Sequence, residues 1–387
     1  MLDFSIDKDL ELISDAVSKR CREFDDEYWT NKDEEHEFPW EFYQAMVDDG
    51  WVGIAIPEEF GGGGRGITEA ATVLHEIALS GAAMNGCSAV HTTIFGLEPV
   101  RKYGNQRLCE EVLPRAASGD LHVAFGVTEA DAGTDTSQVS TRAERFGDEW
   151  FISGRKIWST KGLEADVSLI LVRTSKPLKN RFDGLSLFLV DLDPKYVSIQ
   201  PISKLGRNAV ASCEIFYDNL PVPCDRMVGE EGKGFFHLLD GINPERILVA
   251  AEAVGIGRAA IRMATSYAKE RVVFGRPIGM NQAISHPLAD SYMKLEASWQ
   301  MVMLAAWKYD NGFPCGKEAN TAKFLAAEVA FMACDAALQT HGGMGYATEY
   351  HIQRYWKEAR LMRLAPISQE MVLNFISHQE LGLPRSY

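Results

Sequence analysis

The chain has 387 residues, of which 46% are hydrophobic and 24% charged, so it is long enough for two or three domains and has the composition of a globular protein. Its formal net charge is −15, and no stretch of lysine and arginine is dense enough to follow a nucleic-acid backbone. No apolar run approaches the length of a membrane span. We therefore expect neither a nucleic-acid partner nor a membrane-spanning segment.

The cysteines, the histidines and the N-terminus indicate the compartment. The seven cysteines are odd in number and never closer than eleven residues, which fits neither a disulfide framework nor a zinc pattern. The nine histidines include no HExxH motif, so no metal site is expected. Residues 1–17, MLDFSIDKDLELISDAV, lack the basic and then apolar order of a secretory signal. We expect a soluble, cytoplasmic protein.

The first 120 residues are expected to be helical. Residues 38–53 place apolar side chains at steps of three and four and then reach Gly50 and Gly53. Residues 67–79 and 96–120 have similar patterns. The glycine-rich stretch at 58–66, EEFGGGGRG, is expected to be a plain loop, because no strand precedes it and no lysine–serine pair follows it.

From residue 121 to about 232 the pattern changes to short runs rich in Val, Ile, Phe and Tyr, separated by turn residues. The sequence RFGDEW predicts a hairpin turn centred on Gly147 and Asp148. Because no helical pattern lies between the runs, they predict an antiparallel sandwich or barrel rather than a doubly wound sheet.

Long helices return from about residue 233. Apolar residues alternate at steps of three and four over 247–268 and over 288–309, as in a helical bundle. A third helix is predicted over about 317–340, before Gly342 and Gly343. The sequence GIGRAA, 255–260, fits a dinucleotide-binding pattern, but it lies inside a helical pattern rather than after a strand and is expected to serve helix packing.

Glu245, in the sequence NPERILVA, has two interpretations. Asn243 suits a helix N-cap and Pro244 the first helical position, and an acid beside a helix N-terminus meets the positive end of the helix dipole. In the other interpretation its carboxylate takes a proton from a substrate. These residues alone favour the helix start.

Two segments of the middle region suggest a ligand. In FGVTEADAGTD, 125–135, a strand leads through Thr128 to a turn of small residues, whose backbone N–H groups can meet phosphate oxygens. In KIWSTKG, 156–162, the indole of Trp158 stands beside the hydroxyl of Thr160, which suits a flat ring with polar edges. An ordinary hairpin with turn threonines and a core tryptophan is the more frequent alternative.

These segments resemble those of the acyl-CoA dehydrogenase family, and the resemblance covers nearly the whole chain. Five motifs follow in family order: IPEEFGGGG, VTEADAGTD, KIWSTKG, YAKERVVFGRPI and QTHGGMGYATEY. Two depart slightly, with Thr134 at a usual serine and Ser159 inside the third motif. The resemblance implies an α+β multidomain fold: an N-terminal helical domain over 1–120, a middle antiparallel β-sandwich or barrel over 121–232, and a C-terminal four-helix bundle over 233–387.

The resemblance also implies FAD as the cofactor. Trp158 would cover one face of the ring and Thr160 would hydrogen-bond to flavin N5. A neighbouring subunit would contribute to each FAD, which implies a homo-oligomer, a tetramer in most of the family. The implied cofactor-binding residues are Phe125, Val127, Thr128, Gly133, Thr134, Trp158, Ser159, Thr160 and Phe274, then Arg271, Gln282, Gln339, Gly342 and Gly343 from the neighbouring subunit, and Ser368 and Glu370 nearer the adenine.

The implied reaction is the α,β-dehydrogenation of an acyl-CoA to its trans-2-enoyl-CoA, with electron-transfer flavoprotein as the electron acceptor. In many members the base is a glutamate in a C-terminal loop, where this chain has Pro366. The isovaleryl-CoA and long-chain branches place it on a helix, at the position of Glu245, so the resemblance implies Glu245 as the base and Glu370 as the alternative. The implied substrate-binding residues are Thr134, Asn243, Arg246, Tyr267, Ala365 and Pro366.

Three questions stay open at this level. Proline has no N–H to donate to the thioester oxygen, so the donor is either Ile367 or a flavin ribityl hydroxyl acting with another group. The alternative functions are an acyl-CoA oxidase-type flavoenzyme and a non-catalytic relative that binds acyl-CoA and FAD. The length and branching of the acyl chain are undecided, since a helix-borne base narrows them only weakly to branched or long chains.

Overall fold

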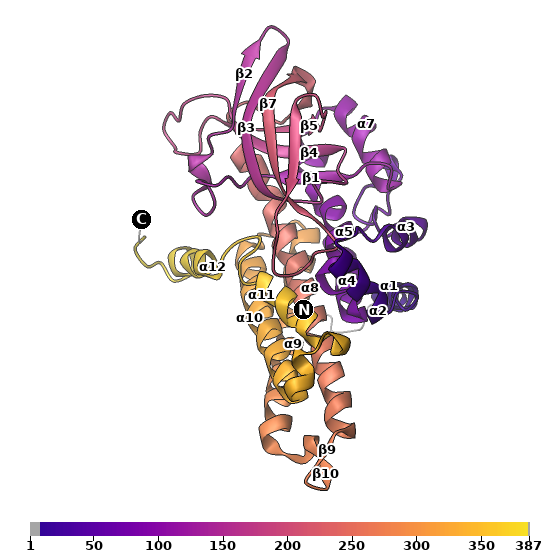
Figure 1. Ribbon diagram of the computed structural model, residues 1–387. Coiled ribbons are helices and arrows are strands. Elements are labelled where there is room, and N and C mark those ends of the chain that lie inside the picture. Colours follow the sequence, from indigo (N-terminus) through magenta and orange to yellow (C-terminus); the bar gives the residue numbers. More distant parts are fainter. Residues whose placement is uncertain (1–7, 386–387) are drawn as a thin grey trace.

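The computed structural model describes residues 8–385, so part of the predicted N-terminal pattern at 1–17 lies outside the described residues. Figure 1 shows a β-sheet at one end of the molecule, N-terminal helices beside it, and long C-terminal helices that extend to the other end. Within the described residues no helix combines the length and hydropathy that crossing a bilayer requires.

The N-terminal region is helical, as predicted. Its helices are α1 (Lys8–Cys21), α2 (Asp26–Glu35), α3 (Trp40–Asp48), α4 (Ile67–Ile77), α5 (Ala83–Gly96), α6 (Glu98–Tyr103) and α7 (Gln106–Ala117). The glycine-rich stretch begins with a single 3-10 turn, Glu58–Phe60, and continues as a loop. The sequence did not predict α5. All of its residues are buried, so it lacks the polar face that makes an amphipathic helix recognisable.

The middle region forms one eight-stranded sheet with the strand order β6-β7-β3-β2-β4-β5-β8, and β1 pairs with β4. Its strands are β1 (Val123–Gly126), β2 (Arg142–Phe146), β3 (Glu149–Thr160), β4 (Val167–Arg173), β5 (Leu185–Asp191), β6 (Val197–Pro201), β7 (Ser212–Pro223) and β8 (Met227–Val228). The predicted hairpin turn at Gly147 and Asp148 is confirmed between β2 and β3. Most pairings are antiparallel, but β1 and β2 each run parallel to β4.

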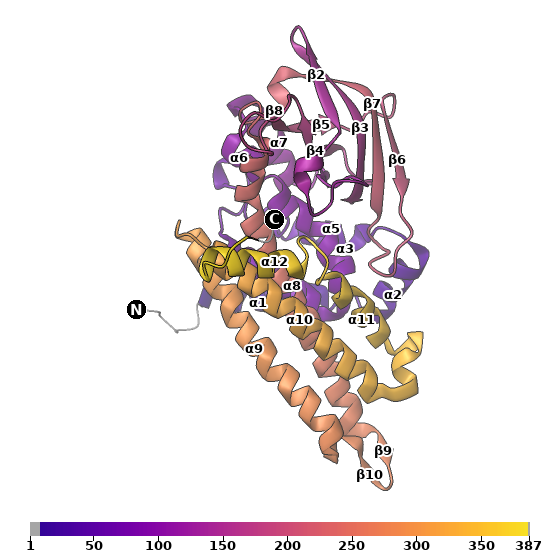
Figure 2. The ribbon, with the colours of Figure 1, turned by 90° about the vertical axis from the view of Figure 1, so that its left-hand side faces the viewer.

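The central strands are buried on both faces. Leu169 and Leu171 of β4 belong to a core shared with α6 and α7, whereas Ile170 and Val172 face a second core shared with β3 and β7. Because successive side chains of a strand point to opposite faces, one strand supplies both cores. The second core lies between strands that curl over one another, which gives the sheet a sandwich-like form (Figure 2).

The C-terminal region contains α8 (Gly234–Glu270), α9 (Gln282–Asp310), α10 (Gly316–His341), α11 (Ile352–Leu361) and α12 (Gln369–Phe375), with the hairpin strands β9 (Val272–Val273) and β10 (Arg276–Pro277) after α8. The predicted seam is confirmed. A Cβ atom at Gly257 would stand 2.6 Å from Leu295 and 3.2 Å from Ala330, so glycine allows α9 and α10 to approach α8 closely. GIGRAA lies inside α8, as predicted.

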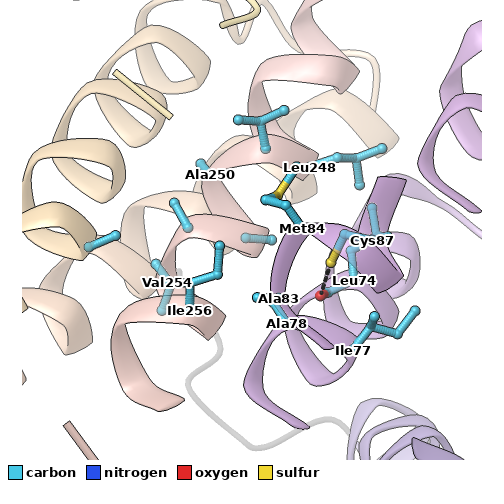
Figure 3. Packing of buried hydrophobic residues seen from close by; sticks show 14 of the residues in the cluster. Leu74, Ile77, Ala78, Ala83, Met84, Cys87, Leu248, Ala250, Val254 and Ile256 are labelled. Carbon is cyan, nitrogen blue, oxygen red and sulfur yellow. Dashed lines mark hydrogen bonds between the residues drawn. The ribbon is translucent and has the colours of Figure 1, made fainter. Parts of the chain in front are cut away.

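The predicted helix start at Asn243 and Pro244 is wrong, because α8 begins at Gly234 and Pro244 lies inside it. An internal proline costs a helix about 3 kcal/mol. Here the preceding turns are held against the sheet, where Leu238 is buried in the β4 core. Tertiary packing therefore outweighs the local stop signal. Figure 3 shows Leu248 of the same helix beside Met84 and Cys87 of α5, in a core cluster that also contains Leu74 and Ile77 of α4.

Candidate active site

Glu245 lies eleven residues after the start of α8, about three turns into the helix, so the helix-cap explanation of this acid does not hold. The residue keeps part of its surface accessible. Burial raises the pKa of its carboxyl to about 7, although His91 and Arg246 act against that rise. A carboxyl with this pKa is ionised about half the time at neutral pH, which suits an acid–base role.

His91 of α5 and Glu252 of α8 form an ion pair beside Glu245. His91 Nδ1 is 2.8 Å from Glu252 Oε1, although the two groups are not aligned as a hydrogen bond. Glu252 has no exposed surface and His91 is 8% exposed. Burial opposes the charge of His91, but Glu252 raises the pKa of the imidazole above its ordinary value. The imidazole also interacts electrostatically with Glu245 and lowers the pKa of that carboxyl.

Arg207 connects this pair to the predicted flavin side. Its Nη1 donates to Ser88 Oγ at 3.1 Å and to Thr160 Oγ1 at 3.3 Å, and its Nη2 donates to Ser212 Oγ at 2.5 Å. The guanidinium is buried and interacts electrostatically with Glu252. We call Glu245, His91, Glu252 and Arg207 the inner site.

The two predicted flavin segments lie side by side. The Ile157 N–H donates to the Thr128 carbonyl at 2.9 Å, and Lys156 Nζ donates to the Val127 carbonyl at 3.1 Å. Lys156 is also 2.8 Å from Glu129, which accepts hydrogen bonds from Ser140 and Thr141. Burial of Glu129 raises the pKa of its carboxyl, but the neighbouring Lys156 outweighs this effect, and the pKa falls to about 2. A buried ion pair therefore fixes the turn that starts at Thr128.

Trp158 projects from a bulge in β3. Its φ is 62°, and the pairing of β3 with β7 shifts register between Lys156 and Ser159. Trp158 is consequently 53% exposed, while Ser159 beside it is buried and its hydroxyl has no hydrogen-bond partner among residues 8–385. In the turn before it, Gly133 and Thr134 are exposed. An open indole face, free backbone and an unpaired hydroxyl fit a flat, polar-edged cofactor such as FAD.

Helix α5 joins the inner site to this flavin segment. The His91 ring lies 4.6 Å from the Phe95 ring, and Phe95 lies 5.7 Å from Phe125 of β1, measured between ring centroids. α5 contacts both β1 and α8. The unpredicted helix therefore brings the candidate base and the predicted ring-binding strand to one place.

Other predicted cofactor residues lie far from the inner site. Arg271, Phe274, Gln282, Gln339, Gly342 and Gly343 are all exposed around the far ends of α8 and α10, and we call them the distal surface. Tyr267, predicted to bind substrate, stacks on His341 at 4.4 Å between centroids. It is 22 residues beyond Glu245 on the same helix, or about 33 Å along the axis. One chain does not bring these residues to Glu245.

The loop before α12 is held by Lys323. Its buried Nζ donates to the Ile367 carbonyl at 2.6 Å and to Gln369 Oε1 at 2.9 Å. Ala365 and Pro366 are partly buried in this loop. Lys323 interacts electrostatically with Arg246, whose Nη1 donates to Asn243 Oδ1 at 3.2 Å. The loop therefore ends near the residue that follows Glu245.

Glu370, the alternative base, has a different environment. It is exposed, and hydrogen bonds from its own backbone and from Ser368 lower the pKa of its carboxyl. Ser368 caps α12 by accepting from the Met371 N–H. Lowering the pKa makes a carboxylate a weaker base, so the two candidates shift in opposite directions, and only Glu245 shifts in the useful one.

Sequence reasoning missed His91, Glu252, Arg207 and Lys323. A signal existed for Glu252, because it interrupts the apolar run ILVAAEAVGIG exactly seven residues after Glu245 and thus lies on the same helix face. His91 lies in the unrecognised α5, and Arg207 lies in a loop without a motif. Among residues 8–385, no three His, Cys, Asp or Glu side chains are grouped to hold a metal ion.

Family models match almost the whole chain. The model for "Acyl-CoA dehydrogenase, N-terminal domain" matches residues 7–120, the middle-domain model 124–220, and the C-terminal-domain model 232–381. The chain is 38% identical over 377 residues to acyl-CoA dehydrogenase fadE12 of Mycobacterium bovis, covering 96% of each. It is 35% identical over 347 residues to an acyl-CoA dehydrogenase of Bacillus subtilis, covering 89% and 91%.

Solved structures agree in fold. The glutaryl-coenzyme A dehydrogenase complex with glutaryl-CoA has a TM-score of 0.95 and 28% identity, covering 100% of this chain and 98% of that one. Butyryl-CoA dehydrogenase from Megasphaera elsdenii has a TM-score of 0.93 and 28% identity, covering 99% and 100%.

Proposed function

Because the chain belongs to the acyl-CoA dehydrogenase family, we propose that Glu245 is the base with which it dehydrogenates an acyl-CoA thioester across Cα–Cβ. Membership of the family makes the protein a flavoprotein oxidoreductase that acts on CH–CH groups, with FAD as its cofactor and acyl-CoA as its substrate class. The product of the proposed reaction is the trans-2-enoyl-CoA.

The environment of Glu245 is the observation that supports this role most directly. A carboxylate in water is a weak base, but burial raises the pKa of this one to about 7 while part of the residue stays accessible. The ionised carboxylate takes the Cα proton, and the electrons of that C–H bond form the new double bond. FAD, when bound, accepts the hydride that leaves Cβ.

The protein positions the cofactor from two chains in this proposal. Backbone groups at 125–128, the Trp158 indole and the Thr160 hydroxyl hold the ring, with Gly133, Thr134 and Ser159 beside it. Ser368 and Glu370 lie toward the adenine. The distal surface lies at the end of α8 remote from Glu245, which supports its use on the FAD of a neighbouring subunit and hence a homo-oligomer. We propose a homotetramer, as in most of the family.

The substrate is held near Glu245 in this proposal. Arg246, oriented by Asn243, and the loop at Ala365 and Pro366 approach the thioester end, while Thr134 meets the CoA portion. Tyr267 lies about 33 Å from Glu245 along α8, so in this proposal it meets the CoA portion only of a substrate bound to a neighbouring subunit. Lys323 fixes this loop through the Ile367 carbonyl. Either the Ile367 N–H or a flavin hydroxyl then donates to the thioester oxygen, since Pro366 has no N–H.

The electron acceptor, chain class and compartment belong to the same proposal. We propose an electron-transfer flavoprotein as the acceptor. A chain of a solved structure described as the electron transferring flavoprotein of Acidaminococcus fermentans has a TM-score of 0.92 and 29% identity, covering 98% of this chain and 100% of that one. A helix-borne base favours branched or long acyl chains, and a cytoplasmic location agrees with the sequence pattern. We keep the domain limits 1–120, 121–232 and 233–387.

Anaerobic reduction of the flavoprotein by a panel of straight and branched acyl-CoAs tests the function. We expect bleaching of the flavin absorbance with wild type, and a rate about 10²–10⁴-fold lower for Glu245→Gln with FAD still bound. Glu370→Gln tests the alternative base and, once saturated with FAD, should bleach at the wild-type rate. A Glu245→Gln variant that bleaches normally would rule out this base. If air rather than an electron-transfer flavoprotein reoxidises the reduced enzyme, the oxidase alternative is favoured.

A further inference from the structure

The proposed reaction leaves the ion pair of His91 and Glu252 without a role. Glu252 lies on α8 seven residues after Glu245, so the two carboxylates share one helix face about 10 Å apart along the axis. Within the described residues neither oxygen of Glu252 has an aligned hydrogen-bond donor, and it has no exposed surface. A buried carboxylate in this situation is stable only beside a cation, and His91 is the group 2.8 Å away.

We propose that His91, held as a cation by Glu252, is a positioning residue that keeps Glu245 ionised and ready to take the Cα proton. The inference rests on the proposed function of Glu245 and deepens it. Glu252 acts through His91, since its own charge repels Glu245. The attraction from His91 is the stronger of the two effects on Glu245.

The surroundings of His91 contain few other charges. From α8 it faces Glu252 and Glu245, and from the loop after β6 it faces Arg207. Phe95 covers the ring within α5 at 4.6 Å between centroids. Arg207 opposes a second cation nearby, so the protonated state of His91 depends on the two carboxylates. Removing Glu252 should therefore neutralise His91.

This arrangement is balanced in both states of the base. Before the reaction the ionised Glu245 has two neighbouring cations, His91 and Arg246. When Glu245 takes the Cα proton it becomes neutral, while His91 and Glu252 remain an ion pair with no net charge. In both states the fully buried Glu252 keeps His91 as its neighbouring cation, which avoids the cost of a lone buried charge.

The test measures the rate of anaerobic flavin reduction by acyl-CoA against pH for four proteins: wild type, His91→Gln, Glu252→Gln and the double variant. In His91→Gln, Glu245 loses the attraction of His91, while Glu252 keeps Arg207 as a neighbouring cation and still repels Glu245, so we expect the acid limb of the profile to move up by about one pH unit. The pKa of Glu245 then moves from about 7 to about 8, so the ionised fraction and the rate at pH 7 fall about fivefold and recover as the pH rises. The double variant removes both charges and should move back toward wild type.

His75→Gln is the matched control. His75 is likewise buried and lies 3.0 Å from a carboxylate, Glu76, but on α4 and without electrostatic interaction with Glu245. Its removal should leave the pH profile in place. Rescue of His91→Gln by Glu252→Gln is the outcome that a packing role alone would not produce.

A measurement on wild type avoids the folding of variants. The ¹⁵N chemical shifts of selectively labelled histidine should show His91 doubly protonated at pH 7, and a neutral His91 would overturn the inference. An unshifted profile in His91→Gln, or no recovery in the double variant, would overturn it as well. If Glu245→Gln keeps normal flavin reduction, the proposed base is wrong; if only the His91 results fail, the base stands and this inference falls.

Discussion

The inner site and the distal surface lie toward opposite ends of α8, and their polar groups are satisfied in opposite ways. In the inner site, buried charges are paired within one chain: His91 with Glu252, and Arg207 with three hydroxyl groups. On the distal surface, Phe274 is fully exposed and Arg271 is exposed beside it. The first is an environment that the chain completes alone.

The difference indicates which part of the chemistry belongs to a single chain. Burial and pairing set the protonation of Glu245 inside one chain, so acid–base behaviour should not depend on assembly. Exposed apolar residues grouped together, as Val272, Phe274 and Met280 are around this hairpin, are typical of surfaces that meet another molecule. Changes in the two regions should therefore have separable effects on stability, cofactor affinity and pH dependence.

The largest expected effect comes from breaking the buried ion pair of Lys156 and Glu129, which lies in the flavin segments beside the inner site. Lys156→Met leaves Glu129 buried without its cation, and we expect a loss of about 3–5 kcal/mol of unfolding free energy. The measurement is the urea midpoint of the holoprotein. Lys156→Met with Glu129→Gln removes both charges and should recover much of the loss. A single variant as stable as wild type would show that this pair does not hold the flavin turn.

The distal surface should respond in cofactor affinity instead. Arg271→Ala removes a guanidinium predicted to bind the FAD of a neighbouring subunit, and a charge-assisted hydrogen bond is worth about 1.5–3 kcal/mol. We expect FAD to bind about 10–100-fold more weakly, measured by titrating the apoprotein, with an unchanged pH profile for flavin reduction. Arg276→Ala, on the same hairpin, is the control and should bind FAD normally. Equal losses in both variants would point to disruption of the hairpin.

The same two regions mark what the sequence can and cannot predict. Periodic patterns located the seam of α8 with its neighbours and the hairpin turn at Gly147, because local spacing determines both. The predicted start of α8 was wrong, because the packing of Leu238 on the sheet outweighs the helix-start signal at Pro244. α5 was missed because it has no polar face.

The candidate site divides in the same manner. The flavin-binding residues were predicted from sequence motifs, and the two segments that contain most of them, 125–135 and 156–162, lie side by side in the structure. His91 and Arg207 reach Glu252 only through the tertiary fold, from segments more than 40 residues away from it in sequence. Charge pairing between distant segments leaves no periodicity, so a single sequence does not reveal it.

Glu245 should reduce stability above neutral pH. Its pKa is about 7 in the folded chain against 4.5 for an ordinary glutamate, so the folded state favours the proton. The stabilisation that comes from this protonation is fully present below about pH 4.5 and is lost as the pH rises through about 7. Glu245→Gln mimics the protonated form, and we expect it to be more stable than wild type by about 1–3 kcal/mol at pH 8, with no gain at pH 4.5. Thermal melts at both pH values measure this, with Glu370→Gln as the control.

The smallest expected change in stability is at Trp158, on the open side of the flavin segment. Because its side chain is 53% exposed, Trp158→Ala should change the unfolding free energy by no more than about 0.5 kcal/mol. Loss of a stacked aromatic face should weaken FAD binding about 2–10-fold and alter the flavin absorbance envelope. Trp307→Ala is the control, since that indole is 47% exposed on α9, away from the flavin segments. An unchanged flavin spectrum in Trp158→Ala would mean that the indole does not face the flavin ring, so that Trp158 of β3 would not stack on the cofactor.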